Sequence, residues 1–314
     1  MQLSPMPAAP SMERDLPATQ TDHAKGLLIT GIGGLALTVD IPLLKLADGD
    51  PWSVLMLRTG VTFLAALVLW SVWRLITPQA PKLVPGRKGL IVAGLYGLGS
   101  IFFVTAVFNT TTANLVFILA FNTMFAAILS WIFLGERPRP ATLLAMAVTI
   151  LGILIIVWDS VGSGNLFGDL MAACSALTIA AAITISRASG ENMGFTSIIG
   201  VIFPFAVAAF MVGGTGFRVD EPWWIILNGA VIMPLSFFCL AAGPRYISGP
   251  EVAMFYLLET VLAPVWMWMI FYETPTRNSL IGGVILIVAL VAHSIWQLVR
   301  GRRRRAETAV EYPA

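Results

Sequence analysis

One acidic residue lies near the middle of an apolar stretch that is long enough to cross a bilayer. The stretch runs from Pro250 to Pro275, PEVAMFYLLETVLAPVWMWMIFYETP, and Glu259 is its only acid away from the two ends. A helix rises about 1.5 Å per residue, which places Glu259 about 13 Å from Pro250 and close to the middle of a hydrocarbon core about 30 Å thick. A charge at that depth costs roughly 3 kcal/mol, and such residues usually face a bundle interior or a water-filled cavity. We therefore expect Glu259 to belong to a functional site.

The same pattern occurs earlier in the chain, which indicates an internal repeat. The stretch from Asn114 to Pro138 reads NLVFILAFNTMFAAILSWIFLGERP and aligns with the stretch around Glu259 at a constant offset. The identical pairs are Thr123/Thr260, Ala126/Ala263, Trp131/Trp268, Glu136/Glu273 and Pro138/Pro275. In this register Asn122 occupies the place of Glu259.

The composition excludes a soluble globular domain. Of the 314 residues, 57% are hydrophobic and 11% are charged, against about 45 to 50% and about 25% in soluble proteins. Several runs exceed the roughly 18 apolar residues that a spanning helix requires. These runs do not alternate between polar and apolar residues, so helices rather than a β-barrel are expected. The predicted fold class is an all-α polytopic membrane protein.

Ten membrane-spanning helices are expected, joined by short loops that contain Gly and Pro. They cover approximately residues 27–46, 52–74, 89–107, 114–134, 141–158, 167–186, 196–213, 223–242, 250–272 and 279–299. The ten helices divide into two five-helix repeats, 26–159 and 160–300, between an N-terminal tail, 1–25, and a basic C-terminal tail, 301–314. The first apolar stretch lacks a small-residue cleavage site, so it is interpreted as a helix and not as a signal peptide.

The basic residues predict the orientation of the chain. If the N-terminus is inside, fifteen Lys and Arg residues lie in the tails and the even-numbered loops, and only Lys45, Arg218 and Arg277 lie on the opposite side. This asymmetry predicts that both ends are cytoplasmic, in the inner (plasma) membrane. The run from Arg302 to Arg305 is interpreted as a cytoplasmic stop signal with affinity for anionic lipid, and not as a nucleic-acid site.

A repeat of five helices contains an odd number of crossings, so the second copy must insert upside down relative to the first. Glu136 then lies at the cytoplasmic side and Glu273 at the outside, where each is expected to order the turn into the next helix. Inverted repeats are the architecture of secondary transporters, whose site lies near the middle of the membrane between the two halves. In such proteins the halves rock around the site to give alternating access.

The sequence resembles the EamA family of the drug/metabolite transporter superfamily. The repeat of this family ends in a large aliphatic residue followed by Gly and Glu, a pattern present as FLGERP at Phe133 to Pro138 and in weaker form as IFYETP at Ile270 to Pro275. DGDPWSVLMLRTG, from Asp48 to Gly60, is similar to the first loop of the family and the arginine of its second helix. The resemblance extends over residues 26–300.

The resemblance implies a ten-helix carrier that moves small metabolites, often exporting amino acids or their relatives, without ATP. The sequence agrees on the energy source, since it has no P-loop and no soluble domain for a nucleotide. No cofactor and no metal are expected, and Cys174 and Cys239 are interpreted as packing residues inside helices. The expected partners are a small-molecule substrate, such as an amino acid, and the lipid bilayer. A monomer and a homodimer are both left open.

Glu259 and Asn122 are the main candidates for substrate binding or coupling. Glu259 could be the counter-charge to a substrate amine, a carboxyl that exchanges a proton because low dielectric disfavours its charged form, or a structural hydrogen-bonding group between helices. Asn122 could bind a substrate carboxylate or amide, or join two helices. Tyr256 shares a helix face with Glu259 at i and i+3. Together with Tyr96 and Trp266, Tyr256 could form an aromatic wall for a flat substrate, although such residues often serve only for packing.

Asp40 and Arg58 are expected at similar depths in the first two helices, so they can form an ion pair. Pairing is the least costly way to keep either charge in the membrane, and the pair could be a gate or a permanent structural link. Pro42 removes a backbone donor and could kink the first helix. His293 could relay protons, but we favour a packing histidine in the last helix.

The competing classes are an intramembrane enzyme and a channel or non-transporting scaffold. An enzyme would need a nucleophile or metal ligands inside the spans, and no HExxH, GxSxG or histidine cluster is present, so no catalytic residue is predicted. Channels usually have rings of charges or a filter motif. The inverted repeat with a single central acid favours a carrier, with the channel or scaffold kept as the alternative.

Overall fold

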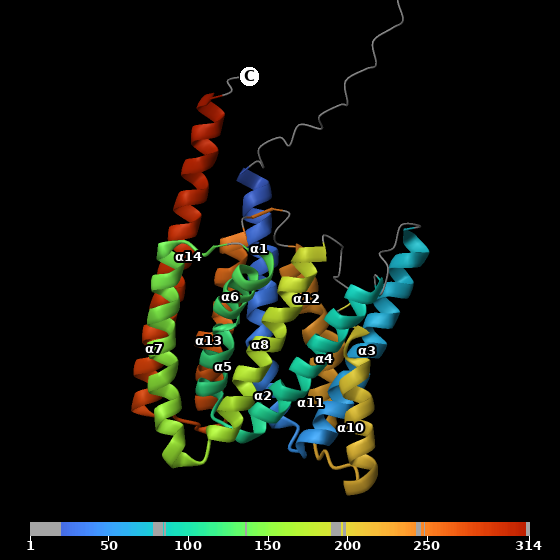
Figure 1. Cartoon of the computed structure of the whole chain (residues 1–314). Coiled ribbons are helices and arrows are strands. Elements are labelled where there is room, and N and C mark those ends of the chain that lie inside the picture. The colour runs from blue at the N-terminus through green and yellow to red at the C-terminus, as the bar shows by residue number, and fades with distance from the viewer. Residues whose placement is uncertain are drawn as a thin grey trace, which may run out of the picture.

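The computed structural model describes residues 20–77, 84, 86–135, 137–189, 196, 199–242, 246–247 and 249–311. They form a bundle in which the long helices run roughly side by side (Figure 1). The helices are α1 (Gln20–Leu37), α2 (Asp40–Leu46), α3 (Pro51–Ile76), α4 (Gly86–Asn109), α5 (Thr112–Ala120), α6 (Asn122–Leu134), α7 (Pro140–Ser163), α8 (Leu166–Ser189), α10 (Ile202–Thr215), α11 (Pro222–Leu227), the π-helical turn η1 (Asn228–Ile232), α12 (Met233–Ala242), α13 (Gly249–Phe271) and α14 (Arg277–Glu311). The predicted all-α fold is confirmed for these residues.

The described ranges contain nine helices, some made of consecutive segments, that are long and apolar enough to cross a membrane. Each overlaps one of the expected spans, as Pro51–Ile76 does for 52–74. The expected span 196–213 is the one that none of these nine helices overlaps. The described helix in that region, α10, has 14 residues and is shorter than a full span. The chain is therefore a multi-pass membrane protein, and the count of ten spans stays a prediction.

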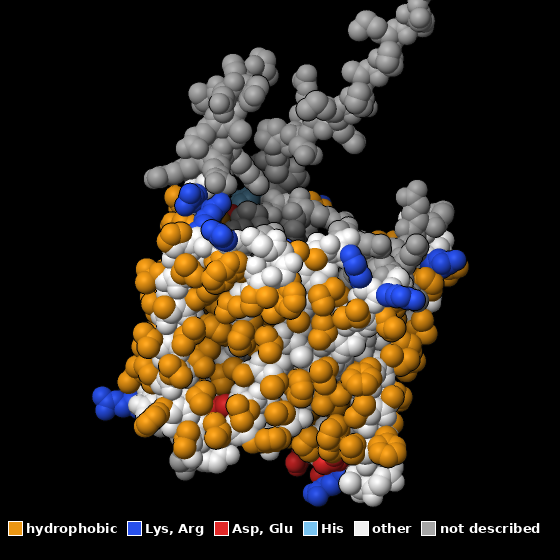
Figure 2. Space-filling view, in the orientation of Figure 1, with side chains coloured by type: hydrophobic (Ala, Val, Ile, Leu, Met, Phe, Trp, Pro, Cys, Tyr) orange, Lys and Arg blue, Asp and Glu red, His pale blue; other side chains and the backbone are white. Residues whose placement is uncertain are grey.

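The surface of the bundle is apolar between two polar rims. Figure 2 shows hydrophobic side chains over most of the visible face, with Lys and Arg gathered at the rim near the chain ends. Large apolar side chains are exposed on several helices, among them Leu75 at 86%, Trp158 at 82% and Phe210 at 80%. An exposed apolar area of this extent is suited to contact with lipid tails and not with water.

Helix boundaries follow from local sequence signals. Asp50 caps α3, because its Oδ1 accepts hydrogen bonds from the backbone N–H of Trp52 at 3.0 Å and of Ser53 at 3.2 Å. Pro51 occupies the first helical position, where its missing N–H has no consequence. At the other end of a helix, Gly135 adopts a left-handed φ of 70° and terminates α6. The Gly and Pro residues between apolar runs therefore mark where helices end and begin.

The first span is broken near its middle, between α1 and α2. Pro42 lacks the N–H that would bond to the carbonyl of Thr38, so the helix cannot continue through Thr38 and Val39. Thr38 Oγ1 instead donates to the carbonyl of Leu35 at 2.7 Å. The kink expected from Pro42 is present one turn earlier, and it places Asp40 at the start of α2.

A second break separates α5 from α6 at Phe121. The Phe121 N–H bonds to the carbonyl of Ile118 at 3.1 Å, which tightens the last turn of α5. Asn122 is thereby the first residue of α6. The corresponding helix of the second half, α13, is continuous through Glu259 and contains Pro264. The two stretches aligned in the sequence thus have different backbones at the aligned position.

The helices pack in pairs, of which α4 with α8 and α7 with α14 are the most extensive. The α7–α14 pair crosses at two glycines. A Cβ on Gly282 would lie 2.5 Å from the carbonyl oxygen of Gly152, and a Cβ on Gly152 would lie 2.8 Å from that of Gly282. The backbones can approach this closely only because neither residue has a side chain.

We predict that Gly282→Ala lowers the thermal unfolding temperature of the detergent-solubilised protein. The added methyl group meets backbone rather than a movable side chain, and overpacking of this kind costs about 1 to 3 kcal/mol. Gly94→Ala is the matched control, since a Cβ there meets nothing within 4 Å. An equal effect of both substitutions would mean that α7 and α14 do not cross at these glycines.

Candidate functional site

Asp40 and Arg58 form a buried ion pair near the break in the first span. Arg58 Nη2 donates to Asp40 Oδ1 at 3.0 Å and to Asp40 Oδ2 at 2.8 Å, and both residues are at most 7% exposed. The guanidinium also lies 5.2 Å from the centre of the Phe103 ring and donates to the sulfur of Met233 at 3.6 Å. Each charge is therefore matched inside the protein. Whether the pair acts as a gate or as a permanent link stays a prediction.

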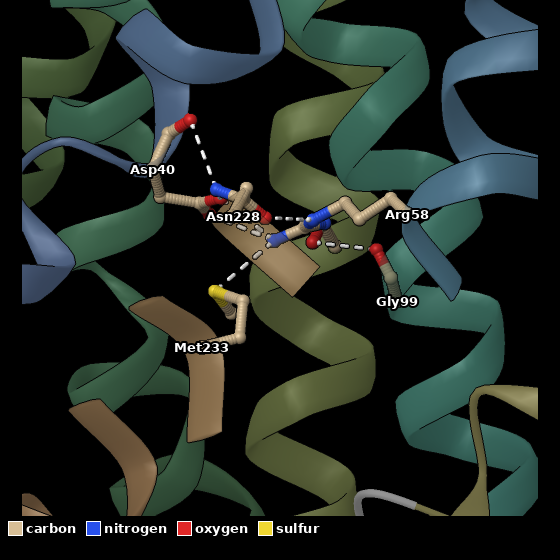
Figure 3. A network of polar contacts seen from close by, with 6 residues as sticks. Asp40, Arg58, Gly99, Asn228 and Met233 are labelled. Atoms are coloured by element: carbon tan, nitrogen blue, oxygen red, sulfur yellow. Dashed lines mark hydrogen bonds and ion pairs between the residues drawn. The ribbon is translucent and has the colours of Figure 1, made fainter. Parts of the chain in front are cut away.

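Asn228 holds this ion pair from the second half of the chain. Its Oδ1 accepts from Arg58 Nε at 3.3 Å, and its Nδ2 donates to Asp40 Oδ1 at 2.7 Å. Figure 3 shows the amide of Asn228 between the two charged groups, with Met233 beside them. Asn228 begins η1, the π-helical turn in the middle of the eighth expected span, and such turns are frequent at functional sites.

The sequence analysis missed Asn228, although one signal was present. Asn228 and Gly229 form an Asn–Gly pair inside the apolar run PWWIILNGAVIMPL. A polar amide followed by glycine within a span is unusual in a lipid-facing helix. Gly229 is needed because a Cβ there would lie 3.0 Å from the carbonyl oxygen of Arg58. The close approach of η1 to α3 brings Asn228 within reach of both charges.

Glu259 lies inside the bundle, near the ion pair but outside its hydrogen-bond network. Its carboxyl interacts electrostatically with Asp40 and Arg58. It forms no hydrogen bond or ion pair with any residue that the structure describes, and part of its surface is accessible. Glu259 therefore differs from Asp40, whose charge is fully matched.

Tyr256 lies one turn before Glu259 on α13. The phenol of Tyr256 interacts electrostatically with Tyr96 and with Glu259, and the residue is 43% exposed. Tyr96 belongs to α4, which packs mainly against α8, whereas α13 packs against α1, α5 and α14. The two tyrosines thus approach each other from helices that belong to different packed groups.

The remaining two candidates lie apart from this group. Trp266 donates from its indole Nε1 to Thr38 Oγ1 at 3.1 Å, and so ties α13 to the break between α1 and α2. Asn122, at the start of α6, is partly buried and forms no hydrogen bond with a described residue. The structure shows no interaction between Asn122 and Glu259. A role of Asn122 in substrate binding remains a prediction.

His293 belongs to a local cluster on α14. Its Nε2 lies 2.8 Å from Gln297 Nε2, and its ring stacks on Trp296 with ring centres 5.9 Å apart. The ring of Trp296 in turn faces the guanidinium of Arg300 at 5.3 Å. These contacts run along one helix face toward the end of α14. They agree with a packing role for the histidine.

Polar contacts join distant segments at the end of the bundle opposite the chain ends. Glu273 Oε2 forms a salt bridge with Lys45 Nζ at 2.9 Å and accepts from Thr112 Oγ1 at 3.3 Å. The carboxylate of Glu273 thus links α2 and α5 across the chain, and the expected role of Glu273 in ordering its own turn stays a prediction. This link forms because both helix ends lie beside the loop that follows α13. Glu136, its counterpart, lies outside the described residues.

The loops at this end are joined as well. Asp50 N–H donates to the carbonyl of Arg218 at 3.2 Å, and Asp220 N–H donates to that of Asp48 at 3.1 Å. Between them lies the isolated β-bridge of Gly49 with Val219. These bonds tie the loop after α2 to the loop before α11. We refer to the region formed by Lys45, Glu273, Thr112 and the two bridged loops as the sealed end.

A second buried polar network lies near the sealed end, and the sequence analysis did not identify it. Asp169, in the first turn of α8, accepts from Thr110 Oγ1 at 2.5 Å and from Asn114 Nδ2 at 3.4 Å. Asn114 Nδ2 also donates to Ser160, and Ser279 donates to Asn114 Oδ1. The network unites the first turns of α5, α8 and α14, where a carboxylate is favoured by the positive ends of the helix dipoles. We interpret it as a structural joint.

The described residues contain no group of three or more His, Cys, Asp or Glu side chains that could hold a metal ion. Cys174 and Cys239 are free thiols. The fold and the interior charges together define a multi-pass helical membrane protein with a polar group of residues at its centre.

The chain belongs to the EamA-like transporter family, whose family model matches residues 24–158 and 166–295. The family is named for transport, and the apolar helices agree with a lipid environment. The resemblance to this family that the sequence motifs suggested is confirmed.

The chain is similar to several transporters of low sequence identity. It is 24% identical over 220 residues to an uncharacterized transporter of Synechocystis, covering 64% of this chain and 63% of that protein, which is less than two thirds of its length. It is 23% identical to the pseudopaline exporter of Pseudomonas aeruginosa, covering 67% of this chain and 75% of the exporter. An uncharacterized transporter of Archaeoglobus fulgidus is 25% identical, with 77% of this chain and 86% of that protein covered.

A crystal structure with 16% sequence identity has the same fold, with a TM-score of 0.60. The match covers 87% of this chain and 97% of that one. At this identity the likeness concerns the fold alone.

We predict that neutralising one member of the central ion pair destabilises the protein more than neutralising both. Arg58→Gln leaves Asp40 buried without an opposite charge, which costs about 3 to 5 kcal/mol. The double variant with Asp40→Asn removes both charges and should recover much of the lost thermal stability in detergent. Arg277→Gln, at an exposed position, should change stability by no more than about 0.5 kcal/mol. Strictly additive effects of the two central substitutions would show that the charges are not coupled.

Proposed function

We propose that the chain is a secondary transporter that exports amino acids or related small metabolites across the inner (plasma) membrane by alternating access. The observation that carries the proposal is Glu259. It is an acid inside an apolar bundle, with accessible surface and with no hydrogen-bond partner among the described residues. A structural carboxyl at this depth would be expected to have a hydrogen-bonding partner, whereas a substrate-binding or proton-exchanging carboxyl must be left open.

The proposed architecture is ten spans arranged as two inverted five-helix repeats, 26–159 and 160–300. The family match in two stretches, 24–158 and 166–295, supports two units. Further support comes from the start of α1 and the end of α14, which lie at the same end of the bundle (Figure 1). An even number of crossings is needed to return to the same side, so α10 is counted as the tenth crossing in the proposed architecture. The excess of basic residues in the tails supports a cytoplasmic location for both ends.

Residues from both halves meet at the centre, as alternating access requires. Asp40 and Arg58 come from the first repeat, and Asn228 and Glu259 come from the second. Motion of one repeat against the other must change these contacts or pivot about them. The sealed end is a candidate for the closed gate of the present state. Its salt bridge and loop bonds can form and break with less cost than buried contacts, because they lie near water.

Export is supported by the similarity to a pseudopaline exporter, and an amine-bearing substrate is supported by the acid within the apolar helix α13. Two uses of Glu259 fit its position. The carboxylate can pair with the substrate amine, or it can bind a proton in one half of the cycle and so couple export to a proton gradient. Both uses require an ionisable group that reaches solvent from the interior.

Flux in proteoliposomes tests the proposal. The purified chain is reconstituted, and uptake of a panel of labelled amino acids and amines is followed with and without a pH gradient. A carrier gives saturable uptake that is stimulated by unlabelled substrate on the opposite side. Flux that rises linearly with concentration, or no flux above empty liposomes, would argue for a channel or a scaffold.

We predict that Glu259→Gln lowers the initial rate of gradient-driven uptake at least tenfold while the protein remains folded. The amide has a similar size but can neither hold a charge nor exchange a proton. The matched control is Glu251→Gln, the same change two turns earlier on α13, where Glu251 lies beside His23 at 3.7 Å. Unchanged transport by the Glu259 variant would remove this residue from the mechanism.

A further inference from the structure

We propose that Glu273 is the latch of a gate at the sealed end, and that its carboxylate must release Lys45 and Thr112 before a solute can pass on that side. This inference rests on the proposed function and deepens it by assigning the gate to named contacts. The gate is closed in the present structure. Because the latch is a single side chain, its release can be measured separately from transport.

The carboxylate of Glu273 uses both of its oxygens to hold helices of the first half of the chain. Oε2 lies 2.9 Å from Lys45 Nζ, in the last turn of α2, and accepts from Thr112 Oγ1 at 3.3 Å. Oε1 accepts from the backbone N–H of Thr112 at 2.5 Å. Thr112 is the first residue of α5, where the positive end of the helix dipole favours a carboxylate. Glu273 itself follows α13, in the second half.

The latch can open at lower cost than the central ion pair. The side chains of Lys45 and Glu273 are 20% and 21% exposed. An ion pair that already contacts water gains little net stability, because water solvates its groups when they separate. The side chains of Arg58 and Asp40 are only 8% and 4% exposed, and their separation would leave buried charges without partners. The contacts of Glu273 are therefore suited to repeated opening.

The residue before the latch is held in a strained conformation. Tyr272 has a φ of 55°, in the left-handed region that favours glycine. Gly135 occupies the aligned position of the first half and has a φ of 70°. The side chain of Tyr272 is 83% exposed, so packing of its ring does not offset the strain. The contacts of Glu273 help to hold this turn, and their release lets Tyr272 relax.

The bridged loops are coupled to the latch through the end of α2. The Glu221 N–H donates to the carbonyl of Ala47 at 3.0 Å. Ala47 follows α2 directly and lies two residues after Lys45. A movement of Lys45 away from Glu273 therefore also displaces the loop contacts. The latch and the loops should open together.

Hydrogen–deuterium exchange of the full chain in lipid nanodiscs, resolved by mass spectrometry, tests the inference without a transport step. The amides of interest are those of Thr112 and of the bridged loops, 47–50 and 218–221. Glu273→Gln keeps an oxygen for Thr112 but removes the charge that holds Lys45. We expect at least tenfold faster exchange at Thr112 and in both loops. Arg277→Gln, at an exposed position of the same end, is the matched control and should leave these amides unchanged.

Two variants of Tyr272 separate the strain from the loss of the ring. Tyr272→Gly adopts the left-handed conformation without a steric conflict and should slow exchange at the sealed end at least twofold. Tyr272→Ala also removes the ring but keeps a Cβ, so it should exchange at the native rate. Equal exchange of the two variants would contradict the strained latch. Thermal unfolding of each variant shows whether a change in exchange reflects the whole fold.

A cross-link tests whether release is needed for passage. In a chain without Cys174 and Cys239, Lys45→Cys and Glu273→Cys are joined by a bifunctional maleimide, and a monofunctional maleimide is the control. The cross-linked chain should lose at least nine tenths of the saturable flux in proteoliposomes, and the control should keep it.

Two results would overturn the inference. One is undiminished flux through the cross-linked chain, and the other is exchange in Glu273→Gln that is unchanged or faster at Thr112 alone, as for a purely local link. Saturable flux of the native chain would leave the carrier proposal intact in both cases. Joint opening of the latch and the loops in a chain without saturable flux would instead count against the carrier proposal.

Discussion

The buried ion pair of Asp40 and Arg58 is the interaction on which the centre of the molecule depends. The hydrocarbon core of a membrane contains no water to solvate a charge, so each charged side chain must be paired within the bundle. Two local departures from regular helix serve this match. The break before Asp40 frees its carboxylate at the start of α2, and the π-helical turn aims Asn228 at both charges. Three helices are thereby joined across the two halves of the chain.

The same need for a partner distinguishes Glu259 from the other acids of the structure. Four other acids have partners in the protein: Asp40 has Arg58, Asp169 has Thr110 and Asn114, Glu273 has Lys45, and Glu251 lies beside His23. Glu259 interacts with the ion pair only at a distance and keeps accessible surface. We propose that its carboxyl is available to a ligand or a proton, and that Tyr256, on the same face of α13, supplies the apolar part of a binding surface.

The sequence predicts the helices and most of the central residues, but not the contacts between them. Apolar runs separated by Gly and Pro locate the spans within a few residues, because each spanning helix must form its backbone hydrogen bonds within itself. The sequence identifies Glu259, Asp40 and Arg58 because a charged residue inside an apolar run is costly and therefore rare. Asn228 and the partners of Glu273 were not predicted, since these contacts depend on segments far away in the sequence. The repeat in the sequence does not predict the backbone, because the helix is broken between α5 and α6 where α13 is continuous.

The accessibility of position 259 to a charged reagent is the most direct measurement of the central claim, that Glu259 faces a solvent-filled interior. In a chain without Cys174 and Cys239, Glu259→Cys is treated with a membrane-impermeant thiol reagent from either side of oriented vesicles. The account predicts labelling from the side that carries the chain ends and protection at the sealed end. Val261→Cys, 45% exposed in the native residue and on the opposite face of α13, should react only with a lipid-soluble maleimide. If Glu259→Cys also reacts only with the lipid-soluble reagent, its side chain faces lipid and the account is contradicted.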